Sequence, residues 1–264
     1  MEVLSHGHVL AEGPRGLPDG SVLFSDVVAG GVHRIGPDGG APETVIERRR
    51  GVGGLLPDAS GGIVVTGRDL AVSDQQGELR TVLAVGGQVV EPGGPLDGAG
   101  GVLVGVLRYR PIAGEDPVPG EVWHLPVSGE PVILARDVVW PNGIGVSPDR
   151  ATLYVSDFAD SLVLAYERDG SGRRVFARSP RGSCDGLAVD AEGGVWTALG
   201  PGGGVARFAP DGSLSEIIEI PDEFVSSVSF AGPDLRDLLI TTATSVLRGH
   251  APVAGLAIPP AAFG

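Results

Sequence analysis

Three polar side chains in this chain have the chemistry to bind one cation together. Glu12 precedes a Gly-Pro pair, Asn142 lies in the segment Pro-Asn-Gly-Ile-Gly-Val, and Asp185 lies in Asp-Gly-Leu-Ala-Val. The last two segments share one pattern, which indicates a single structural position used twice. Two carboxylates and an amide oxygen are hard donors that suit Ca²⁺, Mg²⁺ or Mn²⁺, although Zn²⁺ also accepts oxygen ligands. The alternative is that all three are turn residues, because Asn-Gly and Asp-Gly are common turn dipeptides.

Only a fold that gathers distant segments can bring these residues together. The chain holds 44 Gly and 22 Pro among 264 residues, more than a helical protein of this length could absorb without breaking its helices. Hydrophobic residues at 42% and charged residues at 20% are near the norms for globular proteins. No linker or composition shift divides the chain. We therefore expect one β-rich domain over residues 1–264.

Turns that begin with Asp recur along the chain, each followed by a short apolar run. They lie roughly 40 to 50 residues apart, a period typical of propeller blades built from four strands. The six turns are at Asp19, Asp58, Asp97, Asp149, Asp190 and, more weakly, Asp234. A second turn follows one hairpin later at Asp38-Gly39, Gln76-Gly77, Ser128-Gly129, Asp169-Gly170 and Asp211-Gly212, as expected between the third and fourth strands of a blade. The pattern predicts an all-β, six-bladed β-propeller.

Composition also excludes several partners. The formal net charge is −14, with 19 basic residues against 33 acidic ones, which argues against nucleic acid. No apolar stretch approaches the ~20 residues that a membrane span needs. The sole cysteine, Cys184, cannot form an intramolecular disulfide, and residues 1–10 show no basic segment followed by an apolar core. We expect a cytoplasmic protein that binds neither nucleic acid nor membrane.

Several segments resemble the SMP-30/gluconolactonase/LRE-like family of six-bladed propellers, also called the regucalcin family. They occur in the family's order along nearly the whole chain. The matching segments are Leu10-Ala-Glu-Gly-Pro14, Leu23-Phe-Ser-Asp26, Trp140-Pro-Asn-Gly143, Leu153-Tyr-Val-Ser-Asp157, Asp185-Gly-Leu-Ala-Val-Asp190, Gly194-Val-Trp196, Val225-Ser-Ser-Val-Ser-Phe230 and Leu239-Ile-Thr-Thr-Ala243.

The resemblance implies one divalent cation held by Glu12, Asn142 and Asp185. Ca²⁺ is the first expectation, with Zn²⁺, Mn²⁺ and Mg²⁺ as alternatives. The family's lactonases open cyclic esters such as sugar lactones, so the resemblance implies a small-molecule substrate and a hydrolase in which the metal polarises the carbonyl and water attacks it. Asp185 is the candidate for both ligand and general base, a role that needs a carboxylate within reach of the attacking water. The sequence does not predict an oligomeric state.

The third blade departs from the family's pattern Asn-Asp-Gly-x-x-Asp-Pro-x-Gly. This chain reads Glu91-Pro-Gly-Gly-Pro-Leu-Asp97-Gly-Ala-Gly100, which keeps the turn at Asp97 but lacks the Asn. We therefore expect a different or less polar substrate than a hydroxylated sugar ring. Arg108, Tyr109 and Arg110, in a Pro- and Gly-rich insertion, are candidates for compensating substrate contacts, although such a loop is commonly solvated surface.

Two other functions stay open. One is a different metal-dependent reaction, such as isomerisation or ring opening of a biosynthetic or catabolic intermediate, since a fold does not fix a function. The other is a non-catalytic propeller that binds calcium, a small molecule or a protein. Among further residues, Asp26 and Asp157 follow strands and are secondary site candidates. Trp140 and Trp196 are expected to fill the core between blades, and Cys184 is not expected to be catalytic.

Overall fold

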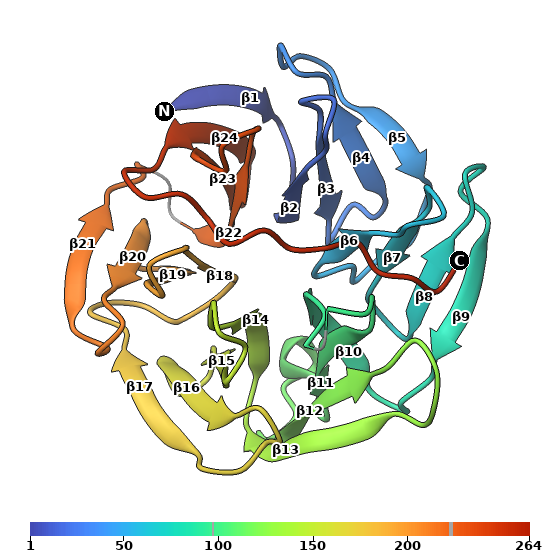
Figure 1. Ribbon diagram of the computed structural model, residues 1–264. Coiled ribbons are helices and arrows are strands. Elements are labelled where there is room, and N and C mark those ends of the chain that lie inside the picture. Colours follow the sequence, from blue (N-terminus) through green and yellow to red (C-terminus); the bar gives the residue numbers. More distant parts are fainter. Residues whose placement is uncertain (97, 222–223) are drawn as a thin grey trace.

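The computed structural model describes residues 1–96, 98–221 and 224–264, which form six four-stranded antiparallel sheets in a ring around one axis (Figure 1). The predicted six-bladed β-propeller is confirmed. Blade 1 contains β2 (Ala11–Gly16), β3 (Val22–Asp26), β4 (Val32–Ile35) and β5 (Glu43–Ile46), from the axis outward. Blade 2 contains β6 (Leu55–Pro57), β7 (Ile63–Val65), β8 (Leu70–Ser73) and β9 (Leu79–Leu83). Blade 3 contains β10 (Gln88–Gly93), β11 (Val102–Leu107), β12 (Gly120–Leu125) and β13 (Val132–Val138).

The second half of the chain repeats this plan. Blade 4 contains β14 (Pro141–Val146), β15 (Thr152–Asp157), β16 (Leu162–Glu167) and β17 (Arg174–Arg178). Blade 5 contains β18 (Leu187–Val189), β19 (Val195–Ala198), β20 (Val205–Phe208) and β21 (Leu214–Ile218). Blade 6 contains β22 (Val225–Ala231), β23 (Asp237–Thr242) and β24 (Ser245–His250), and takes β1 (Glu2–His6) from the other end of the chain as its outermost strand. Pairing of Glu2 with Arg248 therefore closes the ring.

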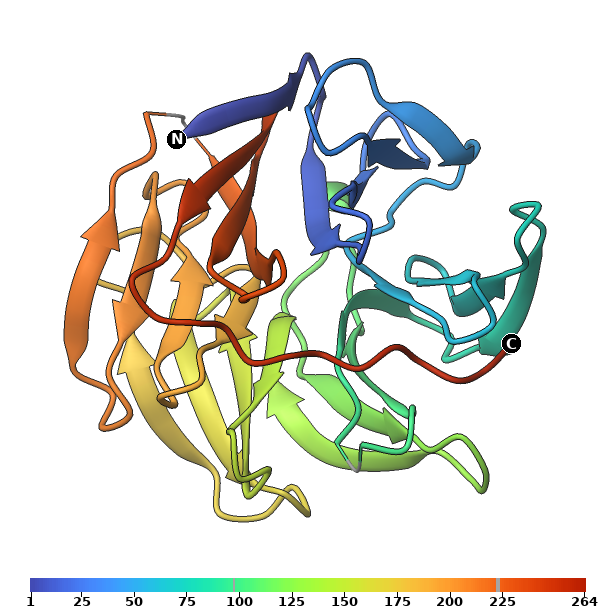
Figure 2. The ribbon, with the colours of Figure 1, turned by 45° about the horizontal axis from the view of Figure 1, so that its top comes forward.

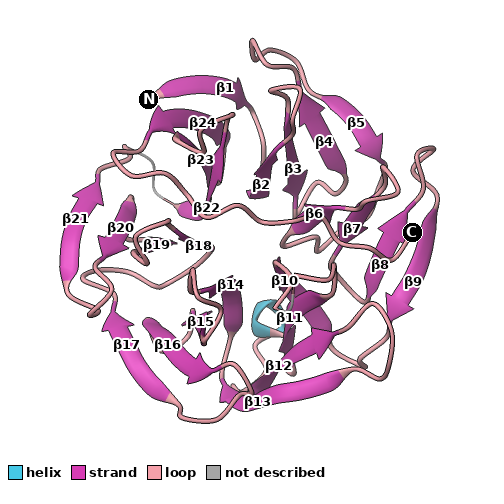
Figure 3. Cartoon of the chain, in the orientation of Figure 1, coloured by secondary structure: helices cyan, strands magenta, loops and turns pink. Residues whose placement is uncertain are grey.

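The predicted turns occupy equivalent places in the blades. The turns that begin with Asp join the first and second strands, apart from Asp97, which lies outside the described residues. The second set joins the third and fourth strands of blades 1 to 5, as predicted. Strands dominate the molecule. Among the described residues, Pro111–Ala113 form one short 3₁₀ helix, η1, shown in cyan in Figure 3. No helix in the described part of the chain has the length and apolar character needed to cross a membrane.

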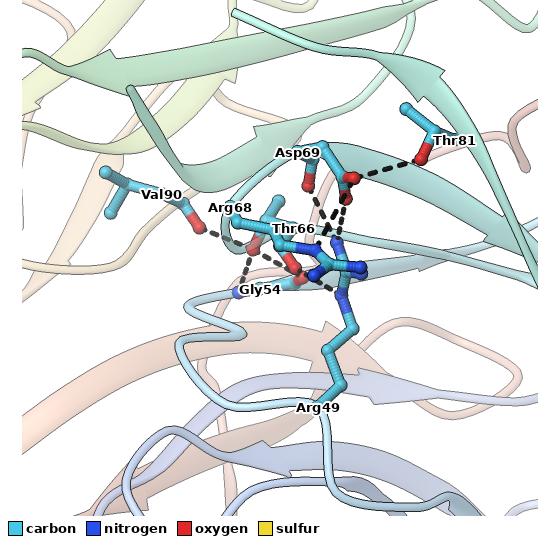
Figure 4. A network of polar contacts seen from close by, with 7 residues as sticks. All are labelled: Arg49, Gly54, Thr66, Arg68, Asp69, Thr81 and Val90. Atoms are coloured by element: carbon cyan, nitrogen blue, oxygen red, sulfur yellow. Dashed lines mark hydrogen bonds and ion pairs between the residues drawn. The ribbon is translucent and has the colours of Figure 1, made fainter. Parts of the chain in front are cut away.

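Neighbouring blades are joined near the axis by hydroxyl groups on or directly after their second strands. Ser25 Oγ donates to the carbonyl oxygen of Val52 at 2.6 Å, and Thr66 Oγ1 donates to that of Val90 at 2.7 Å. Figure 4 shows how Thr66 is itself held. Its carbonyl oxygen accepts from Arg49 Nε at 2.9 Å, and the same guanidinium also pairs with Asp69. These contacts satisfy buried polar groups at blade junctions, where unpaired groups would be costly.

The ring has two distinct faces. All six inner strands begin at one face, here called the upper face, and end at the other, the lower face. Because the second strand of each blade runs back, the insertion at 108–120 between β11 and β12 lies on the upper face. The C-terminal segment 251–264 instead crosses the lower face, passing over the centre of the ring (Figures 1 and 2).

Candidate metal centre

The structure brings Glu12, Asn142 and Asp185 to the upper face at the axis. Glu12 and Asn142 are the second residues of the inner strands β2 and β14, and Asp185 comes two residues before β18. Their exposed fractions are 7%, 8% and 2%. The backbone N–H of Gly143 donates to the carbonyl oxygen of Asp185 at 3.2 Å, which joins the second and third of these segments directly. Three residues from blades 1, 4 and 5 therefore converge.

The glycines that follow the candidate ligands permit close approach of inner strands, so the tight-turn interpretation is wrong for Asn142 and Asp185. A Cβ on Gly143 would lie 2.2 Å from the backbone nitrogen of Leu187, and one on Gly186 would lie 2.1 Å from Ser227 Oγ. In β14 the pairing with β15 also shifts register between Pro141 and Ile144, across Asn142. Such irregularities re-aim side chains and are common beside functional sites.

Two aspartates fix the segments that lead into the ligand-bearing strands. Asp157, at the end of β15, accepts the backbone N–H groups of Val139 at 2.8 Å and Trp140 at 3.0 Å, directly before β14. Asp26, at the end of β3, accepts those of the two residues before Ala11, at 2.9 and 3.4 Å. These secondary candidates therefore position the backbone beside the site.

A fourth acidic residue, Glu91, faces the same part of the channel. It lies on β10, is 1% exposed, and has its Oε1 atom 3.7 Å from Nη2 of Arg15, which is also buried. Burial raises the pKa of Glu91 to about 7, and the Arg15 charge opposes this shift. In the sequence, Glu91 is distinctive only as part of the altered third blade. An acidic residue directly after two valines of an inner strand was the signal that could have found it.

The carboxylates of the centre carry more negative charge than the protein compensates. Burial raises the pKa of Glu12 well above its ordinary value, and the charge of Asp185 raises it further. Burial likewise raises the pKa of Asp185, with the charge of Glu91 adding to the effect. Three buried carboxylates face one guanidinium, that of Arg15, which leaves two negative charges without a partner when all are ionised. Buried charge of this kind is costly unless it is neutralised.

The donor set fits a divalent cation. In the described residues, Asp185 Oδ1 is buried and has no hydrogen-bond partner, so one ligand atom is free to coordinate. Two uncompensated charges match the charge of one Ca²⁺ or similar ion. Across residues 1–96, 98–221 and 224–264, no three His, Cys, Asp or Glu side chains are grouped to hold a metal. Glu91 pairs with Arg15, which compensates its charge.

Aromatic rings line the upper face beside this centre. The ring of Trp140 contacts those of Tyr109 and Phe158, with centroids 6.2 and 4.7 Å apart respectively. Phe158 in turn lies 6.4 Å from Phe224, which precedes the inner strand of blade 6. Trp140 is only partly buried, which differs from the expectation that it fills the core, because it lies in a loop at the edge of the blade. Trp196 is fully buried, as predicted.

The other predicted residues of the insertion make different contacts. Arg108 pairs with Glu121 at the outer part of blade 3, and the exposed Arg110 pairs with Glu115 within the insertion itself. Tyr109 is the residue of this trio that packs toward the ligand-bearing segment, through Trp140. Cys184 is completely buried, and burial raises the pKa of its thiol to about 12, so the thiolate needed for nucleophilic attack does not form near neutral pH.

Fold and site together define a six-bladed propeller with an oxygen-donor centre at one mouth of its channel. The chain belongs to the SMP-30/gluconolactonase/LRE-like family, whose sequence model matches residues 10–244. It is 32% identical over 253 residues to a 6-deoxy-6-sulfogluconolactonase from Pseudomonas putida, covering 91% of this chain and 85% of that protein. A pentonolactonase from Haloferax volcanii is 30% identical over 256 residues, covering 89% and 81%. The solved structure of a calcium-binding regucalcin from Agrobacterium tumefaciens shares the fold, with a TM-score of 0.83, 22% identity, and coverage of 98% and 96%.

Proposed function

We propose that this protein is a metal-dependent hydrolase that opens a lactone at the upper mouth of its channel. The observation that carries the proposal is the buried carboxylate cluster, whose two uncompensated charges and free Asp185 Oδ1 atom suit a cation. The named activities of two relatives that cover most of the chain, both sugar-type lactonases, support the reaction class. Glu12, Asn142 and Asp185 would hold the ion.

Each residue then has a defined task. A bound divalent cation would supply a Lewis acid for the lactone carbonyl. Asp185, as a carboxylate held beside the ion, would accept the proton of the attacking water. The proton that Asp185 accepts would then be returned to the leaving alkoxide. Ca²⁺ stays the first expectation because all three ligands are oxygen donors.

The surroundings favour a lactone with an apolar substituent over a bare sugar lactone. The Asn of the family's third-blade pattern is absent, while the row of Tyr109, Trp140, Phe158 and Phe224 offers apolar ring surface. Tyr109 is the strongest proposed substrate contact of the insertion. Arg108 and Arg110 would first have to leave their ion pairs with glutamates. The cytoplasmic location stays a prediction.

The test combines metal analysis with turnover. The purified protein is stripped with a chelator, and hydrolysis of sugar, alkyl and aryl lactones is measured before and after adding Ca²⁺, Mn²⁺, Mg²⁺ or Zn²⁺. Turnover that depends on one of these ions and prefers alkyl or aryl lactones supports the proposal. Metal binding without turnover of any lactone would contradict the hydrolase assignment. The absence of metal binding would contradict the site itself.

A further inference from the structure

A second cavity lies at the lower mouth of the channel, on the side away from the candidate metal centre. Its volume is about 770 Å³, within the range of sites that bind small molecules. The final residues of the inner strands form its walls. The C-terminal segment, which crosses the lower face of the ring (Figure 2), closes the cavity on its outer side and is here called the roof. Nothing in the proposed lactone chemistry uses this space.

The roof is attached at its two ends and free between them. Leu256 donates its backbone N–H to Val189 in blade 5 at 2.9 Å, and Ala261 donates to Pro57 in blade 2 at 2.9 Å. Within the described chain, residues 257–260 make no hydrogen bond to the blades, and two of them, Pro259 and Pro260, have no N–H to donate. The segment can therefore move away from the cavity without breaking hydrogen bonds along its middle.

Two polar side chains that line this cavity have unused hydrogen-bonding capacity. Arg15 is 8% exposed, and its Nη1 donates to the carbonyl oxygen of Pro14 at 2.8 Å, while its Nε atom has no partner among the described residues. Ser229 is 2% exposed and its Oγ atom likewise has no partner there. A guanidinium has five N–H donors, and each buried polar group left unpaired costs about 1–3 kcal/mol. Rotation of these side chains toward the cavity that they line would let a ligand oxygen recover that loss.

The remaining walls and the local charge define the ligand further. Leu56, Ile144, Leu187 and Phe230 contribute apolar surface. Arg15 is already paired with Glu91, and Glu12 and Asp185 add negative charge on the far side. An anionic ligand would therefore be repelled, whereas a neutral oxygen acceptor would not.

We propose that this cavity is a second binding site, for a small uncharged molecule with an apolar body and one carbonyl or ether oxygen. The oxygen accepts hydrogen bonds from Arg15 and Ser229, and the apolar body lies beneath residues 257–260. The site shares Arg15 with the charge balance of the candidate metal centre but does not depend on lactone hydrolysis.

The test uses Nile red, an uncharged dye with a carbonyl oxygen whose fluorescence rises in apolar surroundings. We expect saturable binding of one dye per chain, displaced by benzophenone but not by benzoate at pH 8. Val146→Phe, which fills the cavity from its wall, should weaken dye binding at least about tenfold. The matched control Val175→Phe, on an exposed outer strand, should leave it unchanged. Ser229→Ala should weaken it about threefold to tenfold, the loss of one hydrogen bond.

Three results would overturn the proposal. One is the absence of saturable dye binding, which would mean that the cavity holds only water. Another is a loss of binding in Trp140→Ala but not in Val146→Phe, which would place the dye on the upper face. The third is displacement by benzoate as effective as that by benzophenone, which would contradict an uncharged ligand. Thermal unfolding of each variant checks folding, and Ser229→Ala serves as the readout if Val146→Phe does not fold.

Discussion

The carboxylate of Asp157 accepts the backbone N–H of Trp140 at 3.0 Å, two residues before the candidate ligand Asn142. Asp26 makes the equivalent contacts ahead of Glu12. The same device is thus used in blades 1 and 4, where an aspartate at the end of the second strand fixes the backbone leading into the inner strand. We infer that both aspartates position ligands without contacting the metal.

Replacing Asp157 should therefore weaken metal binding while leaving the ligands in place. We expect Asp157→Ala to lower Ca²⁺ affinity by about 10–100-fold, as is typical when a group that orients a ligand is lost. Isothermal titration calorimetry measures the change. Asp157→Asn, which keeps an acceptor oxygen, should recover part of the affinity. Asp211→Ala, which removes a similar turn aspartate on an exposed hairpin, should have no effect. Equal affinities for all of these proteins would contradict the positioning role.

Asp185→Asn should stabilise the metal-free protein and abolish the increase in Tm on adding Ca²⁺. The substitution neutralises one of two uncompensated buried charges, so we expect a gain of at least about 1 kcal/mol at pH 8. For a chain of this size that corresponds to roughly 2–4 °C in Tm. Differential scanning calorimetry with and without Ca²⁺ measures both effects. A metal-free variant that is less stable than the wild type would show that the charge of Asp185 has a stabilising partner in the folded protein.

The stability of the metal-free protein should fall as pH rises from about 5 to 8. The pKa values of Glu12, Asp185 and Glu91 are raised, the last to about 7. In this range the folded state therefore binds more protons than the unfolded state, and rising pH favours unfolding. Saturating Ca²⁺ should remove the contributions of Glu12 and Asp185 and leave that of Glu91.

A difference measurement isolates this effect from other groups. Burial lowers the pKa values of His8 and His33. These two residues therefore destabilise the folded protein at low pH, which is opposite to the effect of the buried carboxylates. We therefore compare denaturant unfolding of wild type and Glu91→Gln at each pH. The wild type should lose stability relative to the variant as pH rises through about 7. A difference that does not change with pH would contradict a raised pKa for Glu91.

Gly186 should tolerate no side chain. A Cβ there would lie 2.1 Å from Ser227 Oγ, so Gly186→Ala must push apart the inner strands of blades 5 and 6. We expect destabilisation of about 1–3 kcal/mol or more, together with loss of metal binding. Gly36→Ala is the matched control, because nothing lies within 4 Å of its added Cβ. Urea unfolding compares the two, and equal stability would mean that the inner strands are not tightly packed here.

Trp140→Ala should change which lactone is preferred. Removing the central ring of the aromatic row takes apolar surface away from the upper mouth but leaves the ligands intact. We expect kcat/KM for an aryl lactone to fall by up to about tenfold, in line with about 0.5–1.5 kcal/mol for such a contact, with a smaller change for a sugar lactone. Equal losses for both substrates would indicate a general structural effect instead.

The repeat of turns beginning with Asp was sufficient to predict the number of blades, because each blade uses the same hairpins and buries the same face. The three candidate ligands came from the resemblance, since the spacing of single polar residues is also compatible with turns. Glu91 and Arg15 were missed because their relationship exists only across the axis, between blades 3 and 1. The roof formed by residues 256–261 was missed for a similar reason. It has no periodic pattern, and its partners lie in blades 2 and 5.

The pairing of β1 with β24 has a consequence for biosynthesis. Glu12 lies on β2, and the blade beside this strand is complete only when Glu2 and Arg248, far apart in the sequence, are paired. Until then the nascent protein is an open arc whose terminal blades expose strand edges, a form that invites aggregation. Blade 6 is therefore among the last parts of the ring to be completed as the chain folds.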